Sequence, residues 1–244
     1  MKNSNGRAAK WYGPIMVAAL LVGFAPAGTG ITGTGSVVAD STVRTILADI
    51  FVSTFTILGG PAVTCTSSTA TGDVGVASTT AFTNTGCAIS GTIHAGDALA
   101  AAAYTDYITA YNEIAALTCT GAALTGTLAG RTLAPGVYCV SAEAKTGVLT
   151  LDGPATASWT FKVIDGANTG AFTGTNFSVV LANGAVACNV IWWSEAAATL
   201  TDSDLKGSIL SGAGLTLTRG QFVGRAFAKA GVTMTGVASL SGCS

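Results

Sequence analysis

Threonine pairs recur every 17 residues toward the C-terminal end of this 244-residue chain, at positions 199, 216 and 233. The pairs are Thr199 with Thr201, Thr216 with Thr218, and Thr233 with Thr235. Each pair encloses one apolar residue and follows another, so the strand period of two places both hydroxyls on one face. A repeat of this length is too short for a domain and is typical of one coil of a β-solenoid. The pattern therefore predicts a flat, outward grid of hydroxyl groups.

The spacing of this grid indicates what it can bind. Paired hydroxyls along a strand lie about 6.6–6.8 Å apart and stacked coils about 4.7–4.9 Å apart, which is close to the oxygen spacings on ice surfaces. The β-branch of threonine restricts χ1 and holds the hydroxyls in similar directions. We therefore predict that these six threonines bind the surface of an ice crystal. Thr150, between Leu149 and Leu151, repeats the alternation and is a seventh candidate.

Two other interpretations of the grid stay open. Threonine is common on exposed strands simply because it is β-prone and soluble. A second open wall of the predicted solenoid could also be the ice-binding face. It carries Lys206 and Val223, near Gly207 and Gly224.

Groups that could perform catalysis are sparse. His94 is the one histidine, and the chain has no Gly-x-Ser-x-Gly elbow to combine with it in a triad. Asp202-Ser203-Asp204 could bind a cation or supply paired carboxylates, but we favour a turn at a coil corner as its interpretation. The other carboxylates in question are Asp97, Glu113 and Glu195. We expect His94 to be a hydrogen-bonded turn residue, and we predict a protein that is not an enzyme and has no cofactor.

The N-terminus predicts export. Lys2, Arg7 and Lys10 precede an apolar run over 14–24, and Ala25-Pro26-Ala27 offers a small-residue cleavage site. The run is roughly half of the 20 or so apolar residues that a membrane span needs. We therefore expect a signal peptide at 1–27, a flexible linker at 28–50, a secreted extracellular protein and no membrane span after cleavage.

Export makes disulfides the expected state of the six cysteines. The pairing that we favour is Cys65–Cys87, Cys119–Cys139 and, by remainder, Cys188–Cys243. The first two close loops of about 20 residues, each worth roughly 3 kcal/mol in the chain-entropy description. Cys188 also falls in the 17-residue register with Leu205 and Phe222, so a buried free thiol is its alternative. With no Cys-x-x-Cys pair and one histidine, we expect no metal site.

Composition excludes several partners. Charged residues make up 9% of the chain, against the usual quarter, and the net charge is −1. Binding to nucleic acid requires a positively charged surface, and binding to an anionic membrane requires a polybasic segment. No basic run follows residue 10, so the sequence predicts neither partner. The hydrophobic fraction of 49% supplies ample core.

One helix is predicted among many short strands. Asp97 can cap a helix over about 98–117, whose apolar stripe has spacings of three and four. The stripe is Tyr104, Tyr107, Ile108, Tyr111, Ile114 and Ala115. The 17-residue register also aligns three mostly apolar triplets, Ile191-Trp192-Trp193, Ser208-Ile209-Leu210 and Arg225-Ala226-Phe227. Apolar residues on both faces of a strand indicate a covered wall, and we expect the helix to cover it through buried tyrosines, so that the threonine wall stays open to solvent.

Several segments in order carry a family resemblance that runs from about Phe51 to Thr235. The most specific is Leu133-Ala134-Pro135-Gly136-Val137-Tyr138-Cys139. The others are Ile57-Leu58-Gly59-Gly60, Gly72-Asp73-Val74-Gly75-Val76, Ala110-Tyr111-Asn112-Glu113, Thr118-Cys119-Thr120, Ala187-Cys188-Asn189-Val190-Ile191-Trp192 and Gly224-Arg225-Ala226-Phe227-Ala228. With them the chain resembles the secreted microbial ice-binding proteins, which were first catalogued as a domain of unknown function. Several of those proteins have few or no cysteines, so the six here are a departure.

The resemblance implies a mainly β fold: an irregular right-handed β-solenoid of triangular section with one long helix packed along a wall. It also implies adsorption to ice, which inhibits growth and recrystallisation, and the absence of a catalytic site. We expect residues 51–244 to form this single domain, as a monomer. The family has no short fixed ice-binding motif, so the resemblance does not place the ice face.

Rival functions stay open beside this prediction. A non-enzymatic adhesion or carbohydrate-binding module would expose clustered aromatic side chains, whereas Trp192 and Trp193 are expected to be buried. A polysaccharide-degrading β-helix would need a charged groove, and the 9% of charged residues argues against it. Asn176-Phe177-Ser178 is a glycosylation sequon, which matters only in a eukaryotic host.

Overall fold

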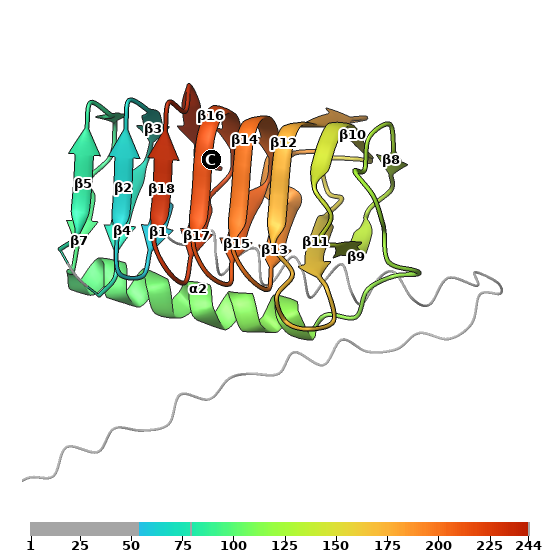
Figure 1. The fold of residues 1–244 in the computed structure, drawn as a ribbon, viewed down its shortest axis with the longest axis horizontal. Helices are drawn as coiled ribbons and strands as arrows, with labels where there is room; N and C mark the ends of the chain where they lie inside the picture. Colours follow the sequence, from blue (N-terminus) through green and yellow to red (C-terminus); the bar gives the residue numbers. More distant parts are fainter. Residues whose placement is uncertain (1–53, 79, 244) are drawn as a thin grey trace, which may run out of the picture. The chain divides into compact units, whose positions relative to one another are not determined.

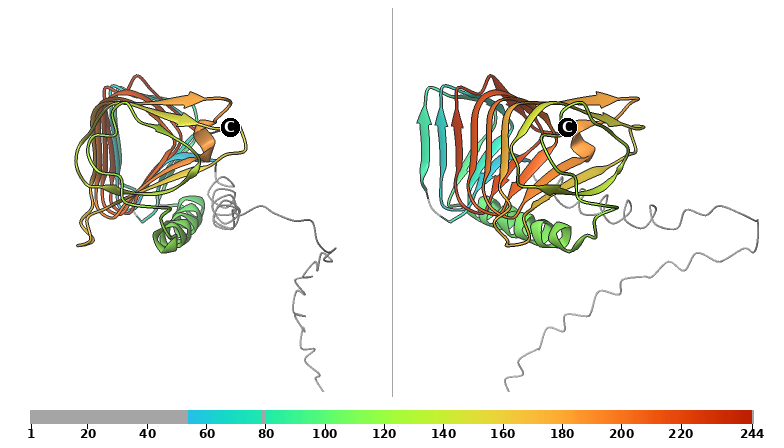
Figure 2. Two further views of the ribbon diagram at one scale, coloured as in Figure 1. Left: turned by 90° about the vertical axis from the view of Figure 1, so that its right-hand side faces the viewer. Right: turned by 45° about the vertical axis from the view of Figure 1, so that its right-hand side comes forward.

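The structure, a computed structural model, describes residues 54–78 and 80–243. The expected signal peptide (1–27) and linker (28–50) lie outside these residues. The described residues form a β-solenoid whose section is triangular when seen along its axis (Figures 1 and 2). Every strand pairing in it is parallel, because each coil lies on the next with its three walls in the same order. The mainly β solenoid fold expected from the sequence is confirmed.

Two sheets make the three walls. The first is an eight-stranded sheet, the helix wall, in the order β7 (Ile93–Ala95), β4 (Asp73–Val76), β1 (Phe55–Gly59), β17 (Ala226–Ala228), β15 (Ser208–Ser211), β13 (Val190–Ser194), β11 (Trp159–Ile164) and β9 (Gly136–Ser141). The second, of eleven strands, bends over two walls.

The longest path in the second sheet is β5 (Phe82–Thr85), β2 (Val63–Thr66), β18 (Val232–Thr235), β16 (Leu215–Val223), β14 (Ala198–Lys206), β12 (Phe172–Ala182), β10 (Lys145–Asp152) and β8 (Thr132–Leu133). Its remaining strands are β19 (Ser239–Ser241), β3 (Thr69–Thr71) and β6 (Ala88–Ile89), which stack in that order from the far end of β16. The long strands β12, β14 and β16 therefore run across a corner and contribute to both walls.

The coils are not stacked in chain order. Strands β17 and β18, near the C-terminal end of the described chain, pair with β1 and β2, its first two strands. The N-terminal coils thus continue the stack beyond the C-terminal ones, which is visible in Figure 1 as blue strands beside red ones.

Side chains that point inward form one continuous core. Phe161, Trp192 and Phe172 stack in it, with ring centroids 4.1 Å apart for Phe161–Trp192 and 5.0 Å for Phe172–Trp192. The core also takes the apolar members of the threonine repeat, such as Leu200 and Leu217, which are fully buried. Burial of these alternating residues is what turns the threonines outward.

Helix α2 (Ala98–Ala116) lies along the helix wall, as predicted. The Asp97 side chain caps it by accepting a hydrogen bond from Ala100 N at 2.9 Å. At the other end Lys162 of β11 donates to the carbonyls of Ala115 and Leu117, at 2.8 and 2.6 Å. A cation there stabilises the helix because it meets both free carbonyls and the negative end of the dipole.

Three tyrosines fasten α2 to successive coils. The hydroxyls of Tyr104, Tyr107 and Tyr111 donate to the carbonyls of Lys229, Ser211 and Ser194 at 2.8, 2.6 and 2.9 Å. Tyr107 and Tyr111 are buried, as expected. The predicted stripe is wrong at Ala115, which is exposed. The buried face of α2 passes through Ala110 and Ile114 instead.

These tyrosines make stability sensitive to alkaline pH. Burial raises the pKa of Tyr107 and raises that of Tyr111 to about 12. Above pH 10 or so the unfolded chain loses these protons while the folded protein keeps them. The folded state then binds more protons, and we expect the free energy of unfolding to fall as pH rises from about 10 through 12. Melting temperatures at pH 8–12 test this, and Tyr111→Phe should flatten the decline; an equal slope in that variant would contradict it.

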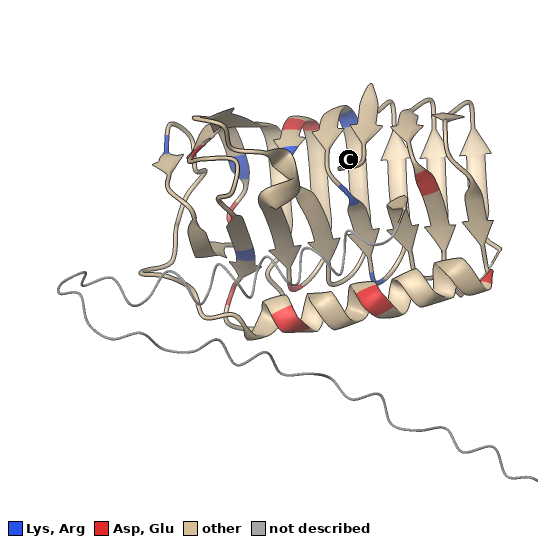
Figure 3. Ribbon diagram, turned by 180° about the vertical axis from the view of Figure 1, so that it is seen from behind, with Lys and Arg blue, Asp and Glu red and all other residues tan. Residues whose placement is uncertain are grey.

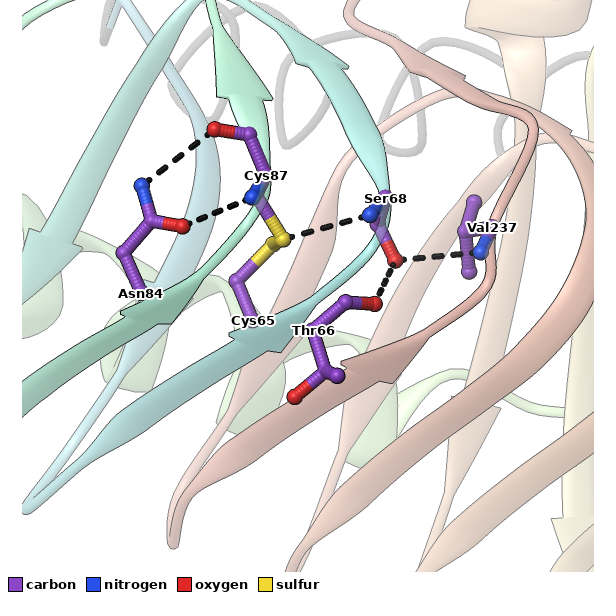
Figure 4. Close-up of a disulfide and its surroundings, with 6 residues drawn as sticks. All are labelled: Cys65, Thr66, Ser68, Asn84, Cys87 and Val237. Atoms are coloured by element: carbon purple, nitrogen blue, oxygen red, sulfur yellow. Dashed lines mark hydrogen bonds between the residues drawn. A yellow bond between two sulfur atoms is a disulfide. The ribbon is translucent and has the colours of Figure 1, made fainter.

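The chain forms three disulfides, Cys65–Cys87, Cys119–Cys139 and Cys188–Cys243. This is the pairing favoured from loop lengths, and the free-thiol alternative for Cys188 is wrong. Cys65–Cys87 holds the outermost coil to its neighbour (Figure 4). Around it, the Asn84 side chain accepts from Cys87 N at 2.8 Å, and Ser68 Oγ donates to Thr66 O at 2.8 Å.

We expect removal of this link by the paired change Cys65→Ala and Cys87→Ala to destabilise the protein by about 3 kcal/mol, because the loop it closes becomes free in the unfolded chain. Denaturant unfolding measures the change, and hydrogen exchange should show the largest loss of protection in β5 and β6. An unchanged unfolding midpoint would mean that packing alone holds the outer coil.

Candidate functional site

The structure brings the six repeat threonines together. Thr199, Thr216 and Thr233 are direct neighbours across β14, β16 and β18, and Thr201, Thr218 and Thr235 form a second column beside them. Because the intervening Leu200, Leu217 and Met234 are buried, both columns face outward. The register predicted from the 17-residue period is thus present in the fold.

The two columns continue well beyond the predicted residues. Strand β12 adds Thr173 and Thr175 on one side. On the other side β2 adds Thr64 and Thr66, and β5 adds Thr83 and Thr85. We call these twelve threonines, two on each of six adjacent strands, the threonine ladder. Figure 1 shows the six strands side by side, from β5 to β12.

A five-residue pattern could have found the missing rows. Each row reads Ala or Gly, an apolar residue, Thr, any residue, Thr. The rows are 62–66, 81–85, 171–175, 197–201, 214–218 and 231–235. A search by fixed period missed three of them because 64 and 83 are 19 positions apart and 173 and 199 are 26 apart.

The ladder is flat and uncharged. The six five-residue rows contain no Lys, Arg, Asp or Glu. The residue two positions before the first threonine is alanine or glycine in every row and is at least partly accessible. Its carbonyl accepts a backbone hydrogen bond from the adjacent row, for example Ala198 N to Gly214 O at 2.9 Å. At this position, therefore, none of the six rows carries a side chain larger than a methyl group.

A regular corner bounds the other flank. The residue directly after each second threonine has a positive φ, between 47° and 75°. These corner residues are Ser67, Gly86, Asn176, Asp202, Arg219 and Gly236. A single left-handed residue turns each coil sharply, so both threonine columns end at the same line. The sequon residue Asn176 is one of these corners.

Asp202 and Arg219 form an ion pair on this corner, with Nε–Oδ1 and Nη2–Oδ2 distances of 2.6 Å. The hydrogen bond from Arg219 lowers the pKa of the Asp202 carboxyl. Ser203 is buried and donates to Thr201 O, and Asp204 pairs with Lys206 at 2.6 Å. Asp202-Ser203-Asp204 therefore serves as a coil corner, and its two carboxylates are engaged by different cations.

Thr150 does not belong to the ladder. It pairs with Val180 and Thr132, and this row lies on the third wall, beyond the corner. The same wall carries Lys206 and Val223, the competitor expected from the sequence. Strand alternation alone could not separate the walls, because it gives the same pattern on each of them. The third wall bears the Lys206–Asp204 pair and exposed valines, so it lacks the uniformity of the ladder.

The remaining candidate groups have structural roles. His94 Nδ1 lies 2.6 Å from Asp97 Oδ2, in the turn that leads into α2. Within 54–78 and 80–243, no three His, Cys, Asp or Glu side chains form a group that could hold a metal ion. No aromatic side chain in those ranges is exposed. From behind, acidic and basic residues are scattered along the ribbon (Figure 3). In the described part of the chain, no helix has the length and apolarity needed to cross a membrane.

Comparisons with known proteins show the family of the chain. The family model described as ice-binding-like matches residues 57–239. An ice-binding protein of Nostoc sp. (strain HG1) is 41% identical over 192 residues, which are 75% of this chain and 69% of the relative.

Solved structures give the same result. The ice-binding protein of the Antarctic ascomycete Antarctomyces psychrotrophicus is 31% identical, with a TM-score of 0.73 over 81% of this chain and 98% of that one. An ice-binding protein from an Antarctic biological consortium is 28% identical, with a TM-score of 0.69 over 90% and 96% of the two chains. The chain belongs to the ice-binding-like family.

Proposed function

We propose that this protein adsorbs to ice through the threonine ladder and thereby inhibits ice growth and recrystallisation. The observation that carries the proposal is the ladder itself, which repeats two hydroxyl groups at one spacing over six adjacent strands. Relatives that are named as ice-binding proteins support the target.

The physical argument rests on preorganisation. Parallel pairing fixes the rows about 4.8 Å apart, and buried neighbours fix the direction of each threonine. A face that is already ordered loses little conformational entropy when it adsorbs. Hydroxyls and methyls can hold ordered water that bridges to the lattice nearly as well as direct hydrogen bonds do. The lack of charge within the rows removes side chains that would keep their own disordered hydration.

The export features and disulfides support secretion as the setting in which this surface meets ice. We further propose that the protein acts as a monomer, because one chain already presents the complete ladder. The aromatic surface that a carbohydrate-binding module would require is missing from the described residues, so the adhesive alternative gains no support.

The direct test is to grow a single ice crystal in the oxidised protein from about residue 28 onward. We expect faceted crystals and a gap between the melting and freezing temperatures. The reduced, unfolded protein at the same concentration is the control. Round, freely growing crystals in the presence of demonstrably folded protein would reject ice binding.

A further inference from the structure

The coil corner that bounds the ladder recurs beyond its last strand, β12. In every ladder row a residue with positive φ follows the second threonine. The same conformation is found at Gly147 and Leu128, whose φ angles are 72° and 67°. Each of these two residues also follows a threonine, Thr146 and Thr127 respectively. The described chain therefore makes this corner twice more, outside the six rows that define the threonine ladder.

The first additional row is the beginning of β10. Lys145 is the direct neighbour of Gly174, the residue between the two threonines of β12. Continuing this register by one residue places Thr146 beside Thr175, at the end of the second threonine column, and Thr146 is partly exposed. Ala144 takes the corresponding place in the first column and is exposed. This row therefore offers a hydroxyl group in one column and a methyl group in the other.

The second additional row lies between α2 and β8 and is not a regular strand. From position 123 it reads Ala-Leu-Thr-Gly-Thr, which is the pattern of the ladder rows. Leu124 packs against the core and Leu128 is buried in it. Alternation between these two turns Thr125 and Thr127 outward, and both are exposed. Thr146 N donates to Thr127 O at 3.2 Å, so this row lies directly beside the first additional row.

A buried lysine fastens this last row. In all six ladder rows an uncharged residue holds the inward position between the two threonines, whereas in β10 that position belongs to Lys145, which is 0% exposed. Its ammonium donates to Gly126 O at 2.9 Å and to Ser141 O at 2.8 Å. The Glu143 carboxylate accepts from Gly126 N and from Ser141 Oγ. The row beside it thus holds both backbone groups of Gly126, the residue between the two outward threonines.

The charge of Lys145 makes this attachment strong. Burial lowers the pKa of the ammonium, and a buried charge is costly unless its hydrogen bonds are made. The two carbonyls that satisfy it belong to Gly126 and Ser141, on different segments. Displacing the last row would therefore leave a buried ammonium short of a partner, which opposes the displacement.

We propose that the ice-binding surface continues past β12 over these two rows, with Thr146 and Thr127 as further binding residues and with Lys145 and Glu143 as the residues that position the last row. This inference rests on the proposed function and extends it. Two more strand spacings lengthen the surface by about 9.6 Å, over which ordered water can bridge to the lattice. The uncharged surface ends there, because the Arg131 guanidinium donates to Thr125 O at 3.2 Å.

Thr146→Tyr and Thr150→Tyr form a matched pair that tests the added rows. Both variants add the same ring to β10 at a partly exposed position, but Thr146 lies before the corner residue Gly147 and Thr150 lies after it, on the third wall. We expect Thr146→Tyr to lower thermal hysteresis at equal concentration by about threefold, equivalent to roughly 0.6 kcal/mol of adsorption free energy. Thr150→Tyr should keep the wild-type activity, and both should keep the melting temperature.

A double-mutant cycle with Thr127→Tyr tests the positioning role. Lys145→Met keeps an unbranched side chain and removes the charge with its two hydrogen bonds. We expect it to reduce ice activity in the wild-type background, and to have no further effect where Thr127→Tyr already blocks the last row. If Lys145→Met does not fold, Glu143→Ala takes its place in the cycle, because Glu143 is exposed. Equal losses in both backgrounds would mean a general structural role and would overturn the positioning of the last row.

The outcomes separate this inference from the proposed function. Wild-type activity in Thr146→Tyr, beside a loss in the mid-ladder variant Thr216→Tyr, would confine the surface to six rows and leave the proposed function standing. Equal losses in Thr146→Tyr and Thr150→Tyr would also overturn the inference, because the effect of the ring would then not depend on the wall that carries it. Free growth of ice in folded wild-type protein would reject the proposed function, and the inference with it.

Discussion

Thr216→Tyr should remove most of the ice activity and leave the melting temperature unchanged. Thr216 lies within the ladder between Thr199 and Thr233, is partly exposed, and points away from the core. A phenol ring there projects well beyond the neighbouring methyls and hydroxyls, so a flat crystal face can no longer approach the rows on either side. We expect a loss of about tenfold or more in activity at equal concentration, equivalent to about 1.4 kcal/mol of adsorption free energy.

Gln221→Tyr is the matched control for this change. Gln221 is exposed on the same strand, β16, but lies beyond the corner residue Arg219 on the third wall. The two variants add the same ring to the same strand on different faces. Thermal hysteresis and recrystallisation assays with both proteins locate the face. Full activity in Thr216→Tyr together with loss in Gln221→Tyr would move the site to the third wall.

Tyr107→Asp is expected to have the largest effect on stability. The Tyr107 side chain is 1% exposed, its hydroxyl donates to Ser211 O at 2.6 Å, and its ring meets Phe227 edge-on at 5.7 Å. An aspartate would leave a cavity and place a carboxylate in an apolar site between α2 and its wall. We expect a loss of more than about 2 kcal/mol in the free energy of unfolding, measured by denaturant titration.

Two further variants separate the causes of that loss. Tyr107→Phe keeps the ring and removes only the hydrogen bond, and should cost about 1 kcal/mol. Thr109→Asp puts the same charge on the exposed face of α2 and should stay within about 0.5 kcal/mol of the wild type. If Tyr107→Asp proved as stable as Thr109→Asp, the attachment of α2 through its tyrosines would be wrong.

Local patterns predicted those parts of the fold in which chain order and spatial order coincide. The 17-residue period gave the correct neighbours for Thr199, Thr216 and Thr233, because β14, β16 and β18 follow one another both in the chain and in the sheet. The helix was predicted from Asp97 and the tyrosine spacing, both of which are local signals.

The missed half of the ladder depends on contacts between distant parts of the chain. Thr64 lies beside Thr233 because β2 pairs with β18, and no periodic signal joins residues so far apart. On the other side, the extra length of β12 and the short 3-10 helix at Ala187–Asn189 lengthen one coil, so that Thr173 falls out of step with Thr199. The wall of Thr150 could not be predicted for a different reason, since its alternating neighbours do not reveal which of the three walls they belong to.

The placement of β18 between β16 and β2 has a consequence for folding. In an ordinary solenoid each coil can add to the one before it, so structure can spread from either end. Here the N-terminal coils, which contain β1 and β2, are synthesised first. They have no neighbouring coil on one side until β17 and β18, near the C-terminal end, have been synthesised. Pairing of β18 with β2 must join residues separated by almost the full described length of the chain. Such a long-range contact costs loop-closure entropy and slows folding. A chain truncated before Val232 should therefore lose the middle of its six-row surface, not one edge of it.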